Sequence, residues 1–378
     1  MRVLIDTTYV MMHRLHKSLS IYIFRLLDAI PPSDRSNFKL LVLEETLEYF
    51  QAHYPEFELQ SYHPYSRDVS NRLIKYVRRS LLFRRAVNAS GCGILLVPND
   101  LVMFTAVGTK LKKIQVIHDM KSISNQPKWS VARITSMLYY GLLIWGADRI
   151  VCISNYTKQD LKRYFPWTKA QKLEVVYNSV VIPSKLSGHI PPELEDKKYI
   201  LFVNTLKPYK NAMTLIHAFP KVRGWQDYVM VFVGKDTDYW QSMKAYAEKH
   251  HFSDRLYRYG NLSDDALYSL YRRAALFVTT SLKEGFGYTP IEAAMSHCPV
   301  VSTTCEALSD TTQGLLNYYE PPTDENALAT AISKVLSHPP TREELAEIAA
   351  QLQSSYAPSH QVSGFSRLIG KMDNNSAY

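Results

Sequence analysis

The chain has 378 residues, of which 46% are hydrophobic and 21% charged, with four cysteines and a net charge of +9. This length allows two domains, each with its own core, and the composition excludes a disordered or fibrous protein. The most nearly apolar stretch, 139–147, is too short to cross a bilayer, and the first residues lack the apolar region of a signal peptide. Because the cysteines have no metal-ligand spacing, we expect a reduced, cytoplasmic protein.

The positive charge lies in the amino-terminal half of the chain. Residues 1–185 contain 26 Lys and Arg against 14 Asp and Glu, and the remainder is slightly acidic. Such an asymmetry indicates an anionic partner, for example anionic lipid, nucleic acid or an acidic acceptor. No nucleic-acid-binding module accompanies the charge, so we expect no nucleic-acid partner.

The first predicted elements are a strand at Arg2–Thr7 and a helix at Ile21–Ile30, whose apolar residues recur every three or four positions. The most basic segment, Arg67–Arg85, has the same spacing, which predicts an amphipathic helix with a cationic face. That face is either simply solvated or contacts an anionic membrane, where each basic residue contributes about 1 kcal/mol. Its basic residues are Arg67, Arg72, Lys75, Arg78, Arg79, Arg84 and Arg85.

Two further strands are predicted at 93–98 and 114–117, and the second leads directly into His118 and Asp119. Because α/β proteins bind ligands beyond the carboxyl ends of their strands, His118 is a candidate site residue. A single histidine at a strand end more often has a structural role, and both readings stay open. Residues 182–198 contain three prolines and lose apolar periodicity, which predicts a linker between two domains.

The second half of the chain contains a strand, a glycine-bearing turn and a helix start in one short segment. The apolar run Ala275–Thr280 predicts a buried strand, and the glycines at 285 and 287 allow close approach of the backbone to a ligand. Thr289 as N-cap, with Pro290 and Glu292 behind it, predicts a helix start with a capping box. The free N–H groups of such a helix would stabilise an anion, most simply a diphosphate.

Glu284 and Glu292 lie on either side of this predicted phosphate site, eight residues apart. Two carboxylates in these positions suit a ligand with hydroxyl groups at both ends, such as a nucleoside diphosphate sugar. The alternative is that Glu292 only caps its own helix and that Glu284 is solvated.

The residues E-G-F-G at 284–287, then Glu292 and P-V-V at 299–301, resemble the signature of the large retaining glycosyltransferase family four, which has the GT-B fold. Its members include many bacterial lipopolysaccharide, capsule and glycolipid transferases. The resemblance implies an α/β fold of two doubly wound, Rossmann-like domains that face a central cleft. It places the acceptor domain at 1–185, the donor domain at 186–355, and a helix that crosses back to the first domain, with a tail, at 356–378.

The resemblance also implies roles for individual residues. Glu284 would contact the transferred sugar, Glu292 the ribose hydroxyls, and Lys210 the donor diphosphate. His118 would lie beside the donor sugar, and the backbone at 259–261 would read the base. The expected catalytic residues are His118, Lys210 and Glu284, and the expected donor site comprises Asn204, Lys207, Lys210, Tyr259, Gly260, Glu284, Gly285, Phe286, Gly287, Tyr288, Thr289 and Glu292.

Three positions depart from the family pattern. Ser18–Ile21 stands where the family has a glycine-rich loop, and Asn204 replaces a glycine. His297 stands where a glycine commonly ends the helix, so either this histidine adopts an unfavoured backbone conformation or the helix ends differently.

The sequence therefore predicts a metal-independent retaining transferase that moves a hexose from a nucleoside diphosphate sugar to a glycan or lipid-linked glycan in cell-surface polysaccharide assembly. We expect it to need no cofactor and to work in the cytoplasm, or peripherally at the inner face of the cell membrane. The alternatives are an epimerase or hydrolase of the same fold, or a non-catalytic donor-binding subunit. Asp236-Thr-Asp238 also matches the Asp-x-Asp pattern that holds a metal in a different glycosyltransferase fold, which the two-domain pattern argues against.

Overall fold

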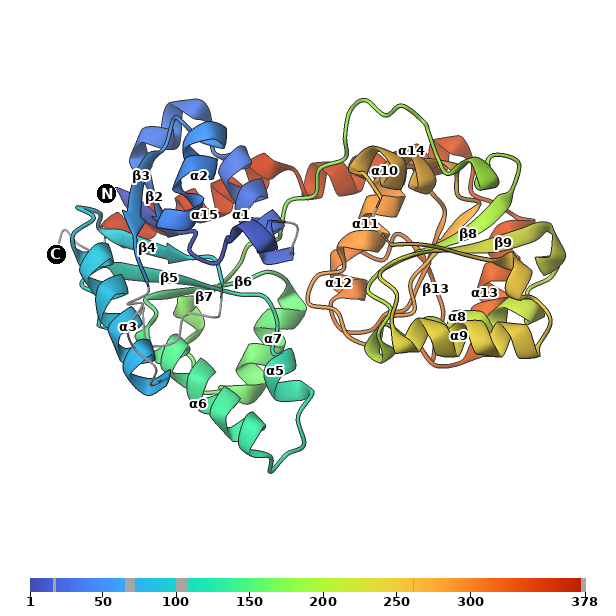
Figure 1. Ribbon diagram of the computed structural model, residues 1–378, viewed down its shortest axis with the longest axis horizontal. Helices are drawn as coiled ribbons and strands as arrows, with labels where there is room; N and C mark the ends of the chain where they lie inside the picture. The colour runs from blue at the N-terminus through green and yellow to red at the C-terminus, as the bar shows by residue number, and fades with distance from the viewer. Residues whose placement is uncertain (16–17, 65–71, 100–107, 261, 375–378) are drawn as a thin grey trace. The chain divides into compact units, whose positions relative to one another are not determined.

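The computed structural model describes residues 1–15, 18–64, 72–99, 108–260 and 262–374, shown in Figure 1. The chain divides into two compact units, one formed by Met1–Ser179 with Pro358–Tyr378 and the other by Val180–Ala357. The sequence places these boundaries after residues 185 and 355. The first unit thus ends a few residues earlier than expected, and the chain returns to it in the last helix.

The first unit is built on a sheet of seven parallel strands in the order β3-β2-β1-β4-β5-β6-β7. Its central strands are buried along their whole length, which is typical of parallel sheets with helices on both faces. The strands are β1 (Val3–Asp6), β2 (Phe38–Leu43), β3 (Glu58–Tyr62), β4 (Ile94–Val97), β5 (Lys112–Ile117), β6 (Arg149–Cys152) and β7 (Leu173–Val175).

The helices of the first unit include the last one of the chain, α15, in which Gln361 accepts a hydrogen bond from the backbone N–H of Ser179. Helix α1 begins at Ser18, so the predicted loop at Ser18–Ile21 is wrong and these residues form the first helical turn. The described helices are α1 (Ser18–Ala29), α2 (Leu47–His53), α3 (Arg72–Asn88), α5 (Lys121–Ser124), α6 (Val131–Gly146), α7 (Asn155–Tyr164) and α15 (Pro358–Asn374).

The predicted basic helix is α3. Phe83 and Val87 on one side are buried in the core, whereas Val77 and Leu81 are 49% and 50% exposed. The apolar side that the sequence predicts therefore contributes only in part to the core. Arg67 and the side chains of Arg72 and Lys75 lie outside the described part of the chain.

The second unit has a sheet of six parallel strands in the order β10-β9-β8-β11-β12-β13. The chain runs outward from β8 to β10 and then crosses to β11 on the other side of β8. The point between β8 and β11 is therefore the switch point at which doubly wound sheets bind ligands. The strands are β8 (Lys198–Val203), β9 (Tyr228–Val233), β10 (Leu256–Tyr259), β11 (Leu276–Val278), β12 (Val300–Ser302) and β13 (Asn317–Tyr318).

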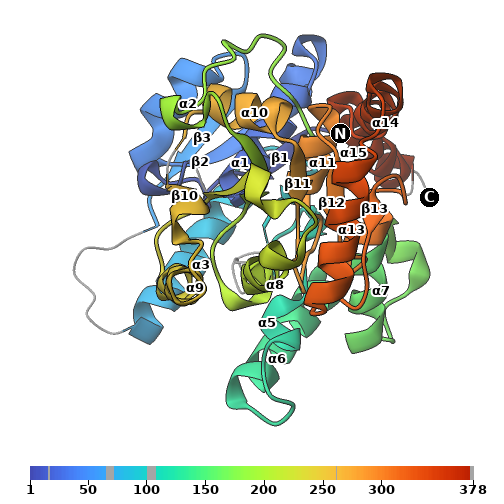
Figure 2. The ribbon, with the colours of Figure 1, turned by 90° about the vertical axis from the view of Figure 1, so that its right-hand side faces the viewer.

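Helices cover both faces of the second sheet (Figure 1 and Figure 2). Helices α8, α9 and α13 pack on one face around buried aromatic residues that include Phe202, Phe232 and Trp240, and α10, α11 and α14 lie on the other. The described helices of the second unit are α8 (Ala212–Ala218), α9 (Asp238–Lys249), α10 (Asp264–Arg273), α11 (Tyr288–Met295), α12 (Leu308–Thr311), α13 (Glu325–Ser337) and α14 (Arg342–Ser355). The predicted pair of doubly wound domains is confirmed.

Candidate functional site

A buried ion pair lies at the switch point of the second unit. Lys210 follows β8 and Glu284 follows β11, and the Lys210 Nζ lies 2.5 Å from Glu284 Oε1, with the two side chains 8% and 10% exposed. Asn204 Nδ2 lies 3.4 Å from the same carboxylate oxygen. Because removing charges from water is costly, such a pair is stable only while both partners are present.

Hydrogen bonds between the two loops hold this ion pair in place. The hydroxyl of Thr280 lies 2.9 Å from the backbone carbonyls of both Lys210 and Asn211. The N–H of Leu282 donates to the carbonyl of Tyr209 over 2.9 Å. The backbone around Lys210 is therefore held in place by the loop that carries Glu284.

Helix α11 starts beside this pair, but not as the sequence predicts. Its N-cap is Gly287, in the left-handed conformation at φ 85°, and no side chain caps the helix. The predicted Thr289 N-cap and the capping box with Glu292 are wrong, because both residues lie inside the helix. A Cβ at position 287 would lie 2.5 Å from Leu308 Cδ2, so only glycine fits this turn. Gly285 is not in the left-handed region.

The carboxyl end of α11 resolves an alternative that the sequence left open. The helix ends at Met295, and His297 adopts the left-handed conformation with φ 61°. The histidine thus takes the backbone geometry for which the family uses glycine, at the cost of strain that a glycine would not have.

The remaining residues of the predicted donor site differ in their exposure. Glu292 is buried, and its charge adds to the effect of burial in raising the pKa of Tyr271 on α10. Phe286 is also buried, with its ring 5.5 Å from that of Tyr356, so its side chain belongs to the core. Lys207 is exposed, Asn204, Tyr288 and Thr289 are partly exposed, and Lys210 is the buried lysine of the loop.

Tyr259 and Gly260 lie at the carboxyl end of β10. The carbonyl of Tyr259 accepts a hydrogen bond from the N–H of Gly234 over 2.8 Å, and its hydroxyl donates to Glu193 over 2.7 Å. Burial and this hydrogen bond both raise the pKa of the Tyr259 phenol. Gly260 is exposed, and Asn261 lies outside the described residues.

The Asp-x-Asp segment forms the start of a helix. Asp236 pairs with Arg258 over 3.4 Å and accepts a hydrogen bond from Gln241, while Asp238 is the first residue of α9. In the described part of the chain, no three His, Cys, Asp or Glu side chains are grouped as a metal site would require. Independence from metal stays a prediction.

Two residues of this edge were missed in the sequence. Glu306, in the loop after β12, accepts a hydrogen bond from the backbone N–H of Glu284 over 2.6 Å. A Cβ on Gly234, after β9, would lie 2.4 Å from the carbonyl oxygen of Asn204. The signal for both was their place just beyond an apolar strand, where parallel strands bring their carboxyl ends together.

In the first unit, His118 follows β5 and contacts the loop after β4. Its Nε2 lies 2.8 Å from the carbonyl oxygen of Pro98, which can only accept, so Nε2 is the donor of this hydrogen bond. The ring packs edge-on against Tyr22 with centroids 4.7 Å apart. The expected proximity of His118 to the donor sugar stays a prediction.

Asp6, in the first unit, is a further residue that sequence reasoning missed. It ends β1 at the switch point between β1 and β4, and it is fully buried. Its Oδ1 accepts a hydrogen bond from the N–H of Thr8 over 2.9 Å, whereas Oδ2 has no hydrogen-bond partner among the described residues. Burial raises the pKa of this carboxyl. The polar residue at the end of the apolar run V-L-I-D was the available signal.

Replacing Asp6 by asparagine is expected to raise the free energy of unfolding at pH 8 by about 1–3 kcal/mol, because it removes a buried charge without a full set of partners. A raised folded-state pKa stabilises the protein at low pH and costs stability as pH rises above the ordinary range of Asp. Urea unfolding at pH 5 and pH 8 measures this, with exposed Asp34→Asn as control. If the free energy of unfolding changed equally between pH 5 and pH 8 in D6N and wild type, the assigned role of the Asp6 charge would be contradicted.

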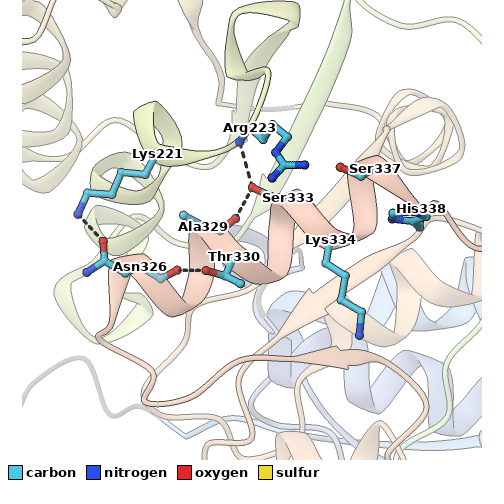
Figure 3. Close-up of a pocket in the computed structure, with 9 residues that line it drawn as sticks. All are labelled: Lys221, Arg223, Asn326, Ala329, Thr330, Ser333, Lys334, Ser337 and His338. Atoms are coloured by element: carbon cyan, nitrogen blue, oxygen red, sulfur yellow. Dashed lines mark hydrogen bonds between the residues drawn. The ribbon is translucent and has the colours of Figure 1, made fainter.

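A hollow of about 500 Å³ in the second unit lies between α13 and the segment after α8 (Figure 3). The ammonium of Lys221 donates to Glu325 and Asn326, and the N–H of Arg223 donates to Ser333. These bonds join the segment to α13, and none of the predicted site residues lines the hollow. We assign it no function.

Residues 189–352, within the second unit, match the family model described as glycosyl transferases group 1. Over these residues, which make up most of the second unit, the chain is similar to this family. The resemblance that the sequence predicts is thereby confirmed, and the buried ion pair, Gly287 and α11 all lie in the matched region. Among the described residues, no helix is both long enough and apolar enough to cross a membrane.

Two curated relatives are mannosyltransferases. The chain is 27% identical over 247 residues to the serotype-specific mannosyltransferase WbdA of Escherichia coli, a match that covers 59% of this chain and 29% of WbdA. It is 29% identical over 222 residues to the O-antigen chain mannosyltransferase RfbU of Salmonella typhimurium, covering 58% of this chain and 59% of RfbU. The chain thus spans less than two thirds of the length of either relative.

Solved structures with the same fold extend over nearly the whole chain. Anabaena Alr3699/HepE, crystallised with UDP-glucose, aligns with a TM-score of 0.75 at 13% identity and covers 98% of this chain and 100% of its own. The lipopolysaccharide outer core galactosyltransferase WaaB aligns with a TM-score of 0.70 at 16% identity, again over 98% and 100%. At these identities the likeness shows the GT-B fold.

Proposed function

We propose that the chain is a retaining glycosyltransferase that transfers a hexose from a nucleoside diphosphate sugar to a hydroxyl of a glycan or lipid-linked glycan in cell-surface polysaccharide assembly. The observation that carries this proposal is the buried pair of Lys210 and Glu284 at the switch point of the second sheet. A donor bound there would meet a lysine for its diphosphate and a carboxylate for its sugar. The buried carboxylate of Glu292 would bind the ribose.

The relatives support the substrate class. WbdA and RfbU are named as mannosyltransferases, and RfbU acts on the O-antigen chain by its name. Their matches extend over little more than half of this chain, so they support the reaction type more directly than the choice of sugar or acceptor. The similarity of residues 189–352 to glycosyl transferases group 1 and the pair of charged residues together favour transfer over the epimerase or hydrolase alternative.

The proposed reaction proceeds by attack on the front face of the sugar. The bond between the anomeric carbon and the leaving phosphate breaks, and the acceptor oxygen forms its bond on the same face, which retains the configuration. The leaving diphosphate takes the acceptor proton. Lys210 and the start of α11 stabilise the negative charge that develops on the diphosphate, and this effect acts on turnover as well as on binding.

Nucleotide-dependent thermal stabilisation tests the donor site. We expect one series among UDP, GDP, TDP and ADP, with their sugars, to raise the melting temperature by a few degrees in EDTA, because a ligand at a hundredfold excess over Kd adds about 2.7 kcal/mol. Glu292→Gln should weaken this shift, while exposed Asp254→Asn should not. Absence of a shift with every nucleotide would contradict the proposed donor site.

The same protein samples then test for transfer. A product with the anomeric configuration of the donor, seen by NMR with a glycan or glycolipid acceptor, is the expected result. Release of free sugar without acceptor would instead indicate a hydrolase, and interconversion of donor sugars an epimerase. Binding without turnover in the presence of acceptors and membranes would indicate a non-catalytic subunit.

A further inference from the structure

Helix α6 in the first unit is apolar on two opposite sides. Tyr140, Leu143 and Ile144 are buried in the core on one side. The other side carries an exposed apolar stripe with helical spacing of three and four residues. We call this the α6 stripe, and its members are Val131 (77% exposed), Ile134 (48%), Leu138 (66%), Leu142 (38%) and Trp145 (69%).

Aromatic side chains extend the α6 stripe. Trp129, just before the helix, is 90% exposed, and Trp167, after α7, is 55% exposed. Between α6 and the end of α7 lies an apolar groove of about 590 Å³, to which Trp145, Phe165 and Trp167 contribute. An exposed patch of this kind marks an interaction site, because water contact with so many large apolar groups is costly.

Exposed positive charges lie beside these apolar residues. Lys128 is next to Trp129, Lys162 and Arg163 lie in the last turn of α7, and Lys169 comes shortly after Trp167; all four are exposed. None of the four forms an ion pair with a described acidic residue. Residues 121–172 contain nine Lys and Arg against two Asp, one of which, Asp160, is buried. The surface is therefore apolar in the middle and cationic at its edges.

We propose that the α6 stripe with Trp129 and Trp167 is a docking surface for an anionic lipid bilayer. Tryptophan favours the boundary between headgroups and acyl chains, and each basic residue near an anionic surface adds about 1 kcal/mol of attraction. A second copy of the chain fits less well, because a symmetric contact would bring the two cationic edges together. This surface is distinct from the basic helix α3 that the sequence indicates.

Vesicle flotation tests this proposal with the full-length protein. We expect binding to vesicles of phosphatidylcholine with 30% phosphatidylglycerol, weak binding to phosphatidylcholine alone, and loss in high salt. The double variant Leu138→Glu, Trp145→Glu should reduce partitioning onto vesicles at least tenfold. The double variant Lys162→Glu, Arg163→Glu should reduce partitioning onto the anionic vesicles. Because these side chains are exposed, the variants should keep the wild-type melting temperature and the nucleotide shift of the donor site.

Matched controls distinguish this proposal from membrane binding through α3 and from dimerisation through the α6 stripe. Arg78→Glu with Arg85→Glu on α3 should bind vesicles like wild type, and brominated lipids should quench tryptophan fluorescence in wild type but less in Trp145→Phe. The proposal would be overturned if the Leu138→Glu, Trp145→Glu variant bound vesicles as well as wild type. It would also be overturned if only the α3 variant lost vesicle binding. A dimer in light scattering that the α6 variant dissociates while vesicle binding is absent would overturn it as well. The nucleotide shift reports on the donor site independently of all these outcomes.

Discussion

Replacing Lys210 by methionine is expected to lower kcat/KM by about two to three orders of magnitude, because the diphosphate would lose its buried positive charge in the transition state. The same change should lower the free energy of unfolding by about 3–5 kcal/mol, because it leaves the Glu284 carboxylate buried without its partner. Steady-state transfer rates and urea unfolding of the ligand-free protein measure the two effects.

A double variant separates the structural role of this pair from its role in the reaction. Lys210→Met with Glu284→Gln removes both charges, so most of the lost stability should return while transfer stays low. Glu284→Gln alone should keep nucleotide binding and lose transfer. Recovery of turnover in the double variant would contradict the proposed reaction, and an unchanged stability in Lys210→Met would contradict the buried ion pair.

Replacing Gly287 by alanine is expected to destabilise the protein by about 2–4 kcal/mol and to weaken nucleotide binding. The left-handed backbone contributes about 1–2 kcal/mol of this cost, and the overlap of the new Cβ with Leu308 the remainder. Because Gly287 is the N-cap of α11, relief of the overlap would move the helix start that we propose as the diphosphate site. Urea unfolding and the nucleotide-dependent melting shift measure both effects.

Gly314 provides a matched control for this substitution. It is also left-handed, at φ 71°, but a Cβ there would meet nothing within 4 Å. Gly314→Ala should therefore show only the backbone cost, with normal nucleotide binding. Adding Leu308→Ala to Gly287→Ala should relieve the overlap, at the cost of a cavity in the core. If Gly287→Ala lowered the free energy of unfolding no more than Gly314→Ala does, the predicted overlap with Leu308 would be contradicted.

The fold could be predicted because its elements are encoded locally. Apolar runs such as the one at β11, and helical spacing such as that of α1, arise from the periods of strands and helices and need no knowledge of distant contacts. The order of strands and helices then restricts the chain to two doubly wound sheets, whose carboxyl edges are the expected ligand sites. The loops with Lys210 and Glu284 could be selected on this basis.

The start of α11 shows where local signals fail. Thr289 and Glu292 have the spacing of a capping box, yet Gly287 is the N-cap, because packing against Leu308 fixes the turn one residue before the helix. The position of Glu306 beyond β12 indicates the sheet edge on which it lies, but no local pattern predicts that its carboxylate binds the N–H of Glu284. Both depend on residues about twenty positions away.

What the sequence determined by itself is the set of elements, their order and the sheet edges that carry the site. Only the tertiary structure decided that Lys210 and Glu284, 74 residues apart, form one buried pair, and that α6 leaves an apolar side exposed. Helix α6 carries apolar residues on two opposite sides, so its periodicity could not say which of them would be buried. Local patterns fix backbone conformation, whereas the burial of a side chain depends on which distant segments pack against it.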